Sequence, residues 1–219
     1  MGRLGWDRKQ DEPTFDTYLR ASAILESATA GNQATIARVK GMFRDHIDGR
    51  HEIDPNIRGA IYYASVWTGG REEWGSMRER FEREKVPEEK NRLLRAISSP
   101  SDPRLILESL DYSLSDKVRL QDAYAIPAIA SSTPVGRKLI LDWTMENWAE
   151  LRKRYASGTH MLGRYVANMG ALSSMADRDH VSSFFSDKKN YRPDVKQALD
   201  KALEQIEANS RFMHTNGKD

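Results

Sequence analysis

The sequence predicts an all-α protein, an α-solenoid built from antiparallel helix pairs. Apolar residues recur at steps of three and four along most of the chain, which is the spacing of one helical face. Prolines repeatedly stand at the start of such a pattern, and the alternation typical of strands is nearly absent. Pairs that recur at roughly 30 to 45 residues favour a HEAT or armadillo type of stacking. Because the pairs share little sequence similarity, a compact helical bundle is the alternative.

Proline and glycine set the boundaries of the expected helices. Proline at the first helical position has no amide proton to lose, and its fixed φ suits the helix. Asp54, Asp102 and Thr133 precede three of the prolines as N-caps. The prolines that start helical patterns are Pro13, Pro55, Pro87, Pro103, Pro134 and Pro193, and the glycines that end them are Gly31, Gly69, Gly70 and Gly158. The predicted helices span residues 13–30, 33–48, 55–68, 71–85, 87–98, 102–112, 116–131, 134–156, 158–170, 176–187 and 193–213.

Composition excludes several functional classes. The chain of 219 residues has 34 Lys and Arg against 32 Asp and Glu, so its net charge of +2 gives no reason to expect nucleic acid or an anionic membrane. It has no cysteine, which excludes disulfides and thiolate-bound metals. No apolar run reaches the ~18 residues of a membrane span, and the N-terminus is charged where a secretory signal is apolar. We expect a cytoplasmic protein without a membrane span.

A possible zinc motif begins at His51 and Glu52, the first two residues of the pattern H-E-x-x-H. That pattern needs a second histidine four residues on, on the same helical face. Here the position is Pro55, which has no metal-binding atom and interrupts a helix that would carry both ligands. The sequence therefore predicts no metal site at this point.

Other candidate groups also have ordinary structural explanations. His180 with Asp177 and Asp179 could surround a cation, but acidic residues are typical of a first helical turn. The segment 152–154 is a short basic patch, which favours a solvated face. The five tryptophans are interpreted as packing anchors between helices: Trp6, Trp67, Trp74, Trp143 and Trp148. The residues thus indicate a helical binding or scaffolding domain without a catalytic residue.

A series of short motifs resembles the C-terminal helical domain of the aminopeptidase-N family of zinc peptidases. The first is "LGW" at Leu4–Trp6, which is followed by Leu19-Arg20. The others occur in the order of the family: "IDPNIRGAIYYASVWTGGREEW", "EEKNRLLRAIS", "DPRLILESL", "VRLQDAYAI", "GRKLILDWTMENWAEL", "MLGRYV" and "FFSDK". Each motif alone is weak, but their common order over nearly the whole chain makes the resemblance specific.

The resemblance implies a bowl of HEAT-like helix pairs, a single domain over residues 1–219, that closes the substrate chamber of a zinc aminopeptidase. Zinc would lie in the catalytic domain of the parent protein, and this chain would hold no cofactor. Its partners would be that catalytic domain and a peptide substrate. Four residues match the family pattern and could face the chamber or the catalytic domain: Arg119, Gln121, Asp122 and Arg164. Polar contacts between neighbouring helices are the alternative role for these four.

Two further expectations depend on the extent of the chain. The sequence resembles a C-terminal fragment, without the catalytic domain and the first helical repeats of the family. Because solenoids need polar capping repeats, such a fragment is expected to expose apolar surface near Trp6 and Phe15 and to self-associate. A freestanding α-solenoid that binds a protein or peptide is the alternative function.

Overall fold

The structure is a computed structural model in which residues 4–156 and 159–216 are described. These residues form helices, turns and loops without any strand, which confirms the all-α fold class. The chain divides into two compact units, Met1–Ser109 and Leu110–Asp219. The expectation of one domain over residues 1–219 stays a prediction.

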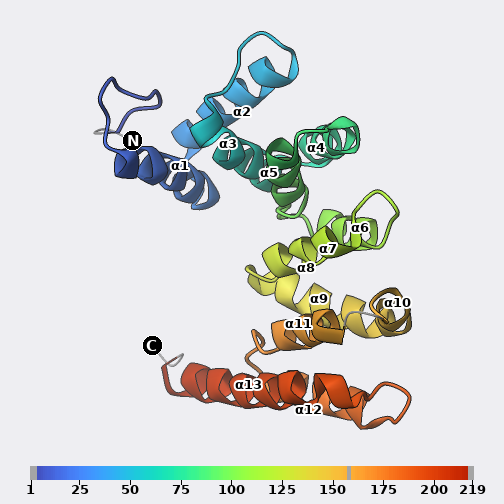
Figure 1. Cartoon of the computed structure of the whole chain (residues 1–219). Coiled ribbons are helices and arrows are strands. Elements are labelled where there is room, and N and C mark those ends of the chain that lie inside the picture. Colours follow the sequence, from blue (N-terminus) through green and yellow to red (C-terminus); the bar gives the residue numbers. More distant parts are fainter. Residues whose placement is uncertain (1–3, 157–158, 217–219) are drawn as a thin grey trace. The chain divides into compact units, whose positions relative to one another are not determined.

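The first unit is a stack of helices in which alternate helices pack together. It contains α1 (Thr14–Thr29), α2 (Gln33–Ile47), α3 (Pro55–Thr68), α4 (Arg71–Arg83), α5 (Pro87–Ile97) and the start of α6 (Pro103–Ser113). Helix α3 contacts both α1 and α5, while α2 packs on α1 and α3, and α4 packs on α3 and α5 (Figure 1). This is the stacking of helix pairs that an α-solenoid requires.

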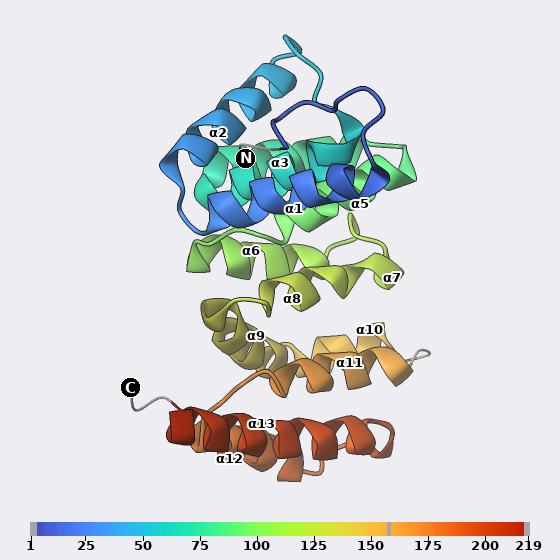
Figure 2. The same ribbon diagram turned by 90° about the vertical axis from the view of Figure 1, so that its left-hand side faces the viewer.

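The second unit repeats the arrangement with helices of more uneven length. It contains α7 (Leu120–Ala123), α8 (Ala125–Ala130), α9 (Pro134–Glu146), α10 (Trp148–Arg154), α11 (Thr159–Met169), α12 (Met175–Ser186), the 3₁₀ turn η1 (Pro193–Val195) and α13 (Lys196–Asn216). Helix α11 packs between α9 and α13, whereas α10 packs on α9 and α12 packs on α13. In Figure 2, α11 and α13 are seen to follow one another in the stack.

Most predicted helix boundaries agree with the structure, and prolines stand at the first helical positions of α3, α5, α6 and α9. Two predicted helices are each divided into two. The predicted helix 116–131 becomes α7 and α8, because Pro127 has no amide proton to donate to the Ala123 carbonyl. The predicted helix 134–156 is interrupted at Asn147, whose side-chain Nδ2 donates to the Trp143 carbonyl over 2.9 Å. Gly158, a predicted helix boundary, lies outside the described residues.

Three tryptophans anchor the cores, as the sequence predicts. Trp74 is buried in the first unit, where its Nε1 donates to the Ile97 carbonyl over 3.1 Å. Trp143 and Trp148 are buried in the second unit, and Trp148 packs edge-on against Phe185 with 5.2 Å between ring centroids. Burying each such ring contributes about 2 to 3 kcal/mol. Trp6 and Trp67 are only half-buried.

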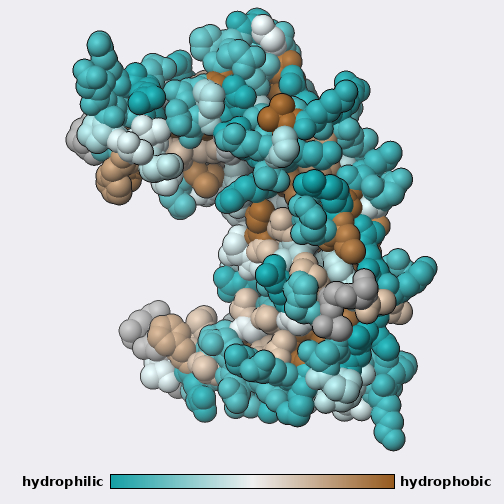
Figure 3. Space-filling view, in the orientation of Figure 1, coloured by the Kyte–Doolittle hydropathy of each residue, from teal (hydrophilic) through white to brown (hydrophobic). Residues whose placement is uncertain are grey.

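Polar residues cover most of the face shown in Figure 3, with apolar side chains between them. Among the described residues there is no helix with both the length and the apolar character that a membrane span requires.

Candidate functional site: the polar surface of α7, α11 and α13

Helix α7 carries three of the four residues that the sequence singles out. Arg119 is the N-cap residue of α7, and its Nε donates to Oδ2 of Asp122 over 2.6 Å. The Arg119 side chain is 59% exposed and that of Asp122 is 21% exposed, so this ion pair lies at the surface. Gln121, on the same turn, is exposed. The pair joins two residues of one short helix, so it does not provide the contact between neighbouring helices that was the alternative role.

Arg164, the fourth residue, reaches the same region through Tyr124. Its guanidinium carbon lies 5.7 Å from the centroid of the Tyr124 ring, a cation–π contact between α11 and the residue that joins α7 to α8. The Tyr124 hydroxyl lies 3.2 Å from the Arg164 carbonyl oxygen and 2.9 Å from Oδ1 of Asn168. Burial raises the pKa of the Tyr124 hydroxyl, although Arg164 and Asn168 oppose the shift, so the group stays a neutral donor.

The structure thus brings Arg164 to the end of α7, and it adds Tyr124 and Asn168, which the sequence did not single out. A signal for Tyr124 existed, because it follows Asp122 by two residues within the motif "VRLQDAYAI". Asn168 had no comparable signal. It stands four residues after Arg164, one helical turn along the same face of α11.

Side chains packed beneath this surface, those of Tyr165 and Arg154, hold Tyr124 and α7 in place. The Tyr165 ring lies edge-on to the Tyr124 ring with 5.2 Å between centroids, and burial raises the pKa of its hydroxyl. Arg154 fixes the segment that leads into α7, donating to the carbonyls of Ser115 over 3.1 Å and Val118 over 3.2 Å, and also to that of Leu114. Arg154 is therefore part of the support of α7, while its neighbour Lys153 is 82% exposed, as a solvated basic face predicts.

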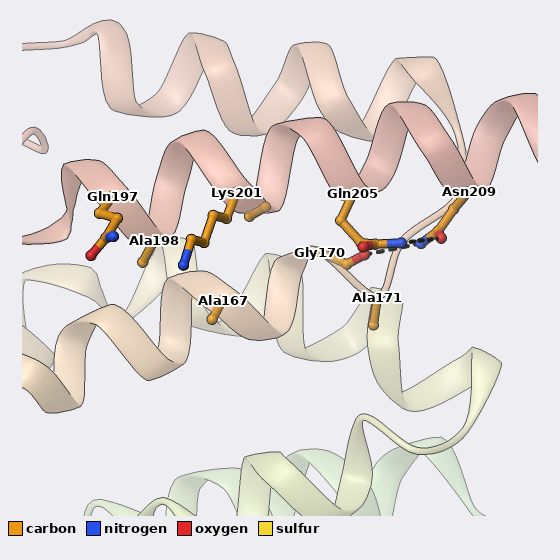
Figure 4. A pocket seen from close by; sticks show the side chains of 9 residues that line it. Ala167, Gly170, Ala171, Gln197, Ala198, Lys201, Gln205 and Asn209 are labelled. Carbon is orange, nitrogen blue, oxygen red and sulfur yellow. Dashed lines mark hydrogen bonds between the residues drawn. The ribbon is translucent and has the colours of Figure 1, made fainter.

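A groove of about 590 Å³ lies between α11 and α13 on the same unit. Its small residues let the two helices approach closely, since an added Cβ on Gly170 would lie 3.3 Å from Cα of Ala202. Figure 4 shows Gln197 and Lys201 of α13 pointing toward α11. At the other end, Nδ2 of Asn209 donates to the Gly170 carbonyl over 3.0 Å. The groove is lined by Ala167, Gly170, Ala171, Gln197, Ala198, Lys201, Ala202, Gln205 and Asn209.

Arg164 and the groove share one face of α11, because Ala167 follows Arg164 by three residues. We call the face formed by Arg119, Gln121, Asp122, Tyr124, Arg164, Asn168 and the groove the α7–α11–α13 surface. It presents guanidinium, ammonium and amide donors beside small apolar side chains. Such groups can hydrogen-bond the carbonyls or a carboxylate of a peptide and accommodate its side chains.

The described residues do not fit a zinc ion. Among them there is no cluster of three or more histidine, aspartate or glutamate side chains able to hold a metal. The sequence "HEID" lies in the connection before α3, which begins at Pro55, and Oε2 of Glu52 pairs with Nη2 of Arg58 at 3.2 Å. Asp177 accepts hydrogen bonds from Ser174 and Lys138. Burial raises the pKa of Asp177, but these hydrogen bonds and the positive charge of Lys138 hold it below the usual value.

Comparison with known proteins adds the family. Residues 1–208 match the family model described as the ERAP1-like C-terminal domain. Aminopeptidase M1-B of Oryza sativa subsp. japonica is 28% identical over 97% of this chain and 24% of its own length. Aminopeptidase M1 of Arabidopsis thaliana is 26% identical over 100% of this chain and 25% of its own length. Aminopeptidase N of Homo sapiens is 25% identical over 95% of this chain and 22% of its own length.

The chain therefore spans about a quarter of the length of the curated relatives that it matches. The resemblance that the ordered motifs predict is confirmed, and the family model covers all of the motif-bearing sequence. On this evidence the chain belongs to the ERAP1-like C-terminal domain family, whose curated relatives here are aminopeptidases of the M1 and N types.

Proposed function

We propose that this chain is the non-catalytic C-terminal domain of a zinc-dependent aminopeptidase, which encloses the substrate chamber and contributes to peptide binding. The observation that carries the proposal is the family match over residues 1–208, with relatives that are aminopeptidases about four times as long as the matched segment. Zinc and the general base would belong to the catalytic domain of the parent. This chain would act as lids do, by excluding water and ordering the chamber when it docks.

Within this role, we assign peptide contact to the α7–α11–α13 surface. Arg164 and Lys201 are exposed cations on facing helices, and the groove between those helices is lined by alanine and glycine. A bound peptide brings backbone carbonyls that need donors and side chains that need apolar surface. Arg119, Gln121 and Asp122 would extend the surface at one end. This arrangement supports binding and orientation of a peptide.

The native polypeptide tests the proposal first. Antibody pull-down from the source cell, followed by intact-mass measurement, is expected to give a product of about four times 25.0 kDa that contains H-E-x-x-H peptides. A native product of 25.0 kDa that captures no zinc peptidase would contradict the proposal and support the freestanding binding module.

A second experiment tests the assigned surface within the parent protein. Arg164→Ala is expected to lower kcat/KM for long peptides by about tenfold, the loss of one charge-assisted hydrogen bond. It should leave hydrolysis of a short aminoacyl p-nitroanilide unchanged, because that substrate does not extend from the zinc site. Lys153→Ala, a change of an exposed cation on α10, is the matched control and should alter neither rate. Equal losses on both substrates would contradict a peptide-contacting role for Arg164.

Two expectations about partners and location stay predictions. Phe15 and Tyr18 lie one turn apart on α1 and are each 70% exposed, which agrees with the expected apolar surface near Phe15. Trp6 is half-buried, with the Arg38 guanidinium carbon 5.9 Å from its ring centroid. Self-association would cover Phe15 and Tyr18, and a monomer mass that is independent of concentration in light scattering would contradict it. Cell fractionation tests the cytoplasmic location.

A further inference from the structure

A buried histidine with an unusual pair of neighbours lies in the first unit, whereas the α7–α11–α13 surface belongs to the second unit. His46, in the last turn of α2, is 8% exposed. Its Nε2 lies 2.8 Å from the hydroxyl of Tyr62 on α3, and that hydroxyl donates to Oε1 of Glu89 on α5 over 2.9 Å. On the other side, Nδ1 of His46 lies 3.4 Å from Oε2 of Glu52, in the connection between α2 and α3.

The hydrogen bonds determine where the protons lie. Burial opposes ionisation of Glu89, but hydrogen bonds from Arg92 and Tyr62 and the charge of Arg58 hold its pKa below the usual value. Glu89 is therefore an ionised acceptor, and it takes the only proton of the Tyr62 hydroxyl. His46 must then donate through Nε2–H. In the neutral ring, Nδ1 carries a lone pair, and this atom is buried without a hydrogen-bond partner.

The neutral ring therefore directs a lone pair at a carboxylate oxygen, whereas a proton on Nδ1 would turn the same contact into a charge-assisted hydrogen bond. Several groups decide when that proton binds. Burial, above all, lowers the pKa of His46. Glu52 and the backbone of His51 oppose the shift, and Arg58 and Arg80 reinforce it. The charged and titratable groups around His46 are Glu52 from the connection, Arg58 and Tyr62 from α3, Arg80 from α4 and Glu89 from α5.

We propose that His46 and Glu52 form a proton-operated latch on the connection between α2 and α3, residues 48–54. At neutral pH the latch is open. The Glu52 side chain is 79% exposed and pairs with Arg58 at 3.2 Å, besides its approach to His46. In mild acid, His46 gains a proton at Nδ1 and holds Glu52 against the end of α2. Glu52, His46, Tyr62 and Glu89 then form one continuous hydrogen-bonded chain from the connection to α5.

The latch is tested by nitrogen-15 NMR of the histidine rings in the 219-residue chain. At pH 7.5 His46 is expected as the neutral Nε2–H tautomer, and it should titrate below the usual histidine range. Glu52→Gln removes the attracting charge and should shift the midpoint of the His46 titration further down. His51→Gln is the matched control, because it changes an exposed neighbour in the same connection and should leave the midpoint unchanged.

Hydrogen exchange supplies a second readout. After correction for the intrinsic pH dependence of exchange, amides of residues 48–54 should become more protected below the His46 midpoint, and Glu52→Gln should abolish this gain. A neutral Nδ1–H tautomer, a midpoint that Glu52→Gln leaves unchanged or raises, or equal protection in both chains would each overturn the latch. Because Glu52 is exposed, its substitution is not expected to prevent folding.

Discussion

Two glycines in the second unit are expected to respond to alanine in opposite directions. Gly136 lies in the first turn of α9 and Gly163 lies in the middle of α11. An added Cβ at Gly163 would lie 3.7 Å from Cβ of Ala198, which is an ordinary van der Waals contact. The same atom at Gly136 would lie 1.9 Å from the carbonyl oxygen of Ala130.

The magnitudes follow from these distances. Replacing a glycine in a helix by alanine gains up to about 1 kcal/mol, so Gly163→Ala should stabilise the second unit by about 0.5 to 1 kcal/mol. At Gly136 the backbone of the corner between α8 and α9 must move, which costs about 1 to 3 kcal/mol. The move also disturbs the hydrogen bond of 2.9 Å from the Gly136 amide to the Thr133 hydroxyl, worth about 1 kcal/mol. Set against the gain of up to about 1 kcal/mol from alanine in a helix, Gly136→Ala should therefore lose about 1 to 3 kcal/mol net.

Urea and thermal unfolding followed by circular dichroism at 222 nm measure both effects. For a chain of this size each kcal/mol moves Tm by about 2 to 4 °C, so Gly136→Ala should lower Tm by roughly 2 to 12 °C. Both glycines belong to the second unit, so the same transition reports both changes even if the units unfold separately. A Gly136→Ala chain as stable as the parent would refute the steric reasoning.

Three further substitutions test the packing and the surface. Hydrogen bonds from Arg20 lower the pKa of Glu12 from 4.5 to about 2, so the stabilisation is complete above pH 4.5 and is lost as the pH falls through 2. Glu12→Gln should flatten the fall of the urea midpoint over that interval, and an unchanged acid slope would contradict this. Trp148→Phe removes a buried donor to the Asn190 carbonyl at 2.9 Å and should cost about 2 kcal/mol in urea unfolding; a loss below about 0.5 kcal/mol would contradict the anchor role. Arg119→Ala breaks only an exposed pair, so its urea midpoint should correspond to a change of less than about 1 kcal/mol, and a larger loss would show a structural role.

The fold could be predicted from local chemistry because prolines and caps mark the helix starts. Asp54 and Thr133 cap α3 and α9 through their side chains, accepting from the amides of Asn56 and Gly136 as predicted. The two missed interruptions have equally local causes. Pro127 lies inside a strongly apolar segment, so the apolar pattern alone predicts a continuous helix although the proline has no amide proton. At Asn147 the side chain adds a hydrogen bond to the Trp143 carbonyl, which already accepts from the Asn147 amide, and helical periodicity alone does not reveal this local arrangement.

The candidate surface could be predicted only in part, because contacts between helices are not encoded in spacing along the chain. Arg119 and Asp122 pair within one turn, so a sequence window contains both. Tyr124 and Arg164 meet across 40 residues, and only the packing of the second unit brings them together. Arg154 appears in the sequence as one of three exposed cations, yet it supports the segment before α7.

Several of the ordered motifs have structural explanations, which limits what the family resemblance says about chemistry. Arg20 is buried and donates to the Leu4 carbonyl over 3.0 Å, so the pairing of "LGW" with Leu19-Arg20 reports the attachment of the N-terminal segment to α1. Trp74, in the longest motif, is a core anchor. Such motifs identify the domain because its packing requires them. A role in peptide binding must instead come from polar surface side chains that packing does not require. Gln121 and Lys201 are exposed examples of such side chains, so substituting them is the most informative test.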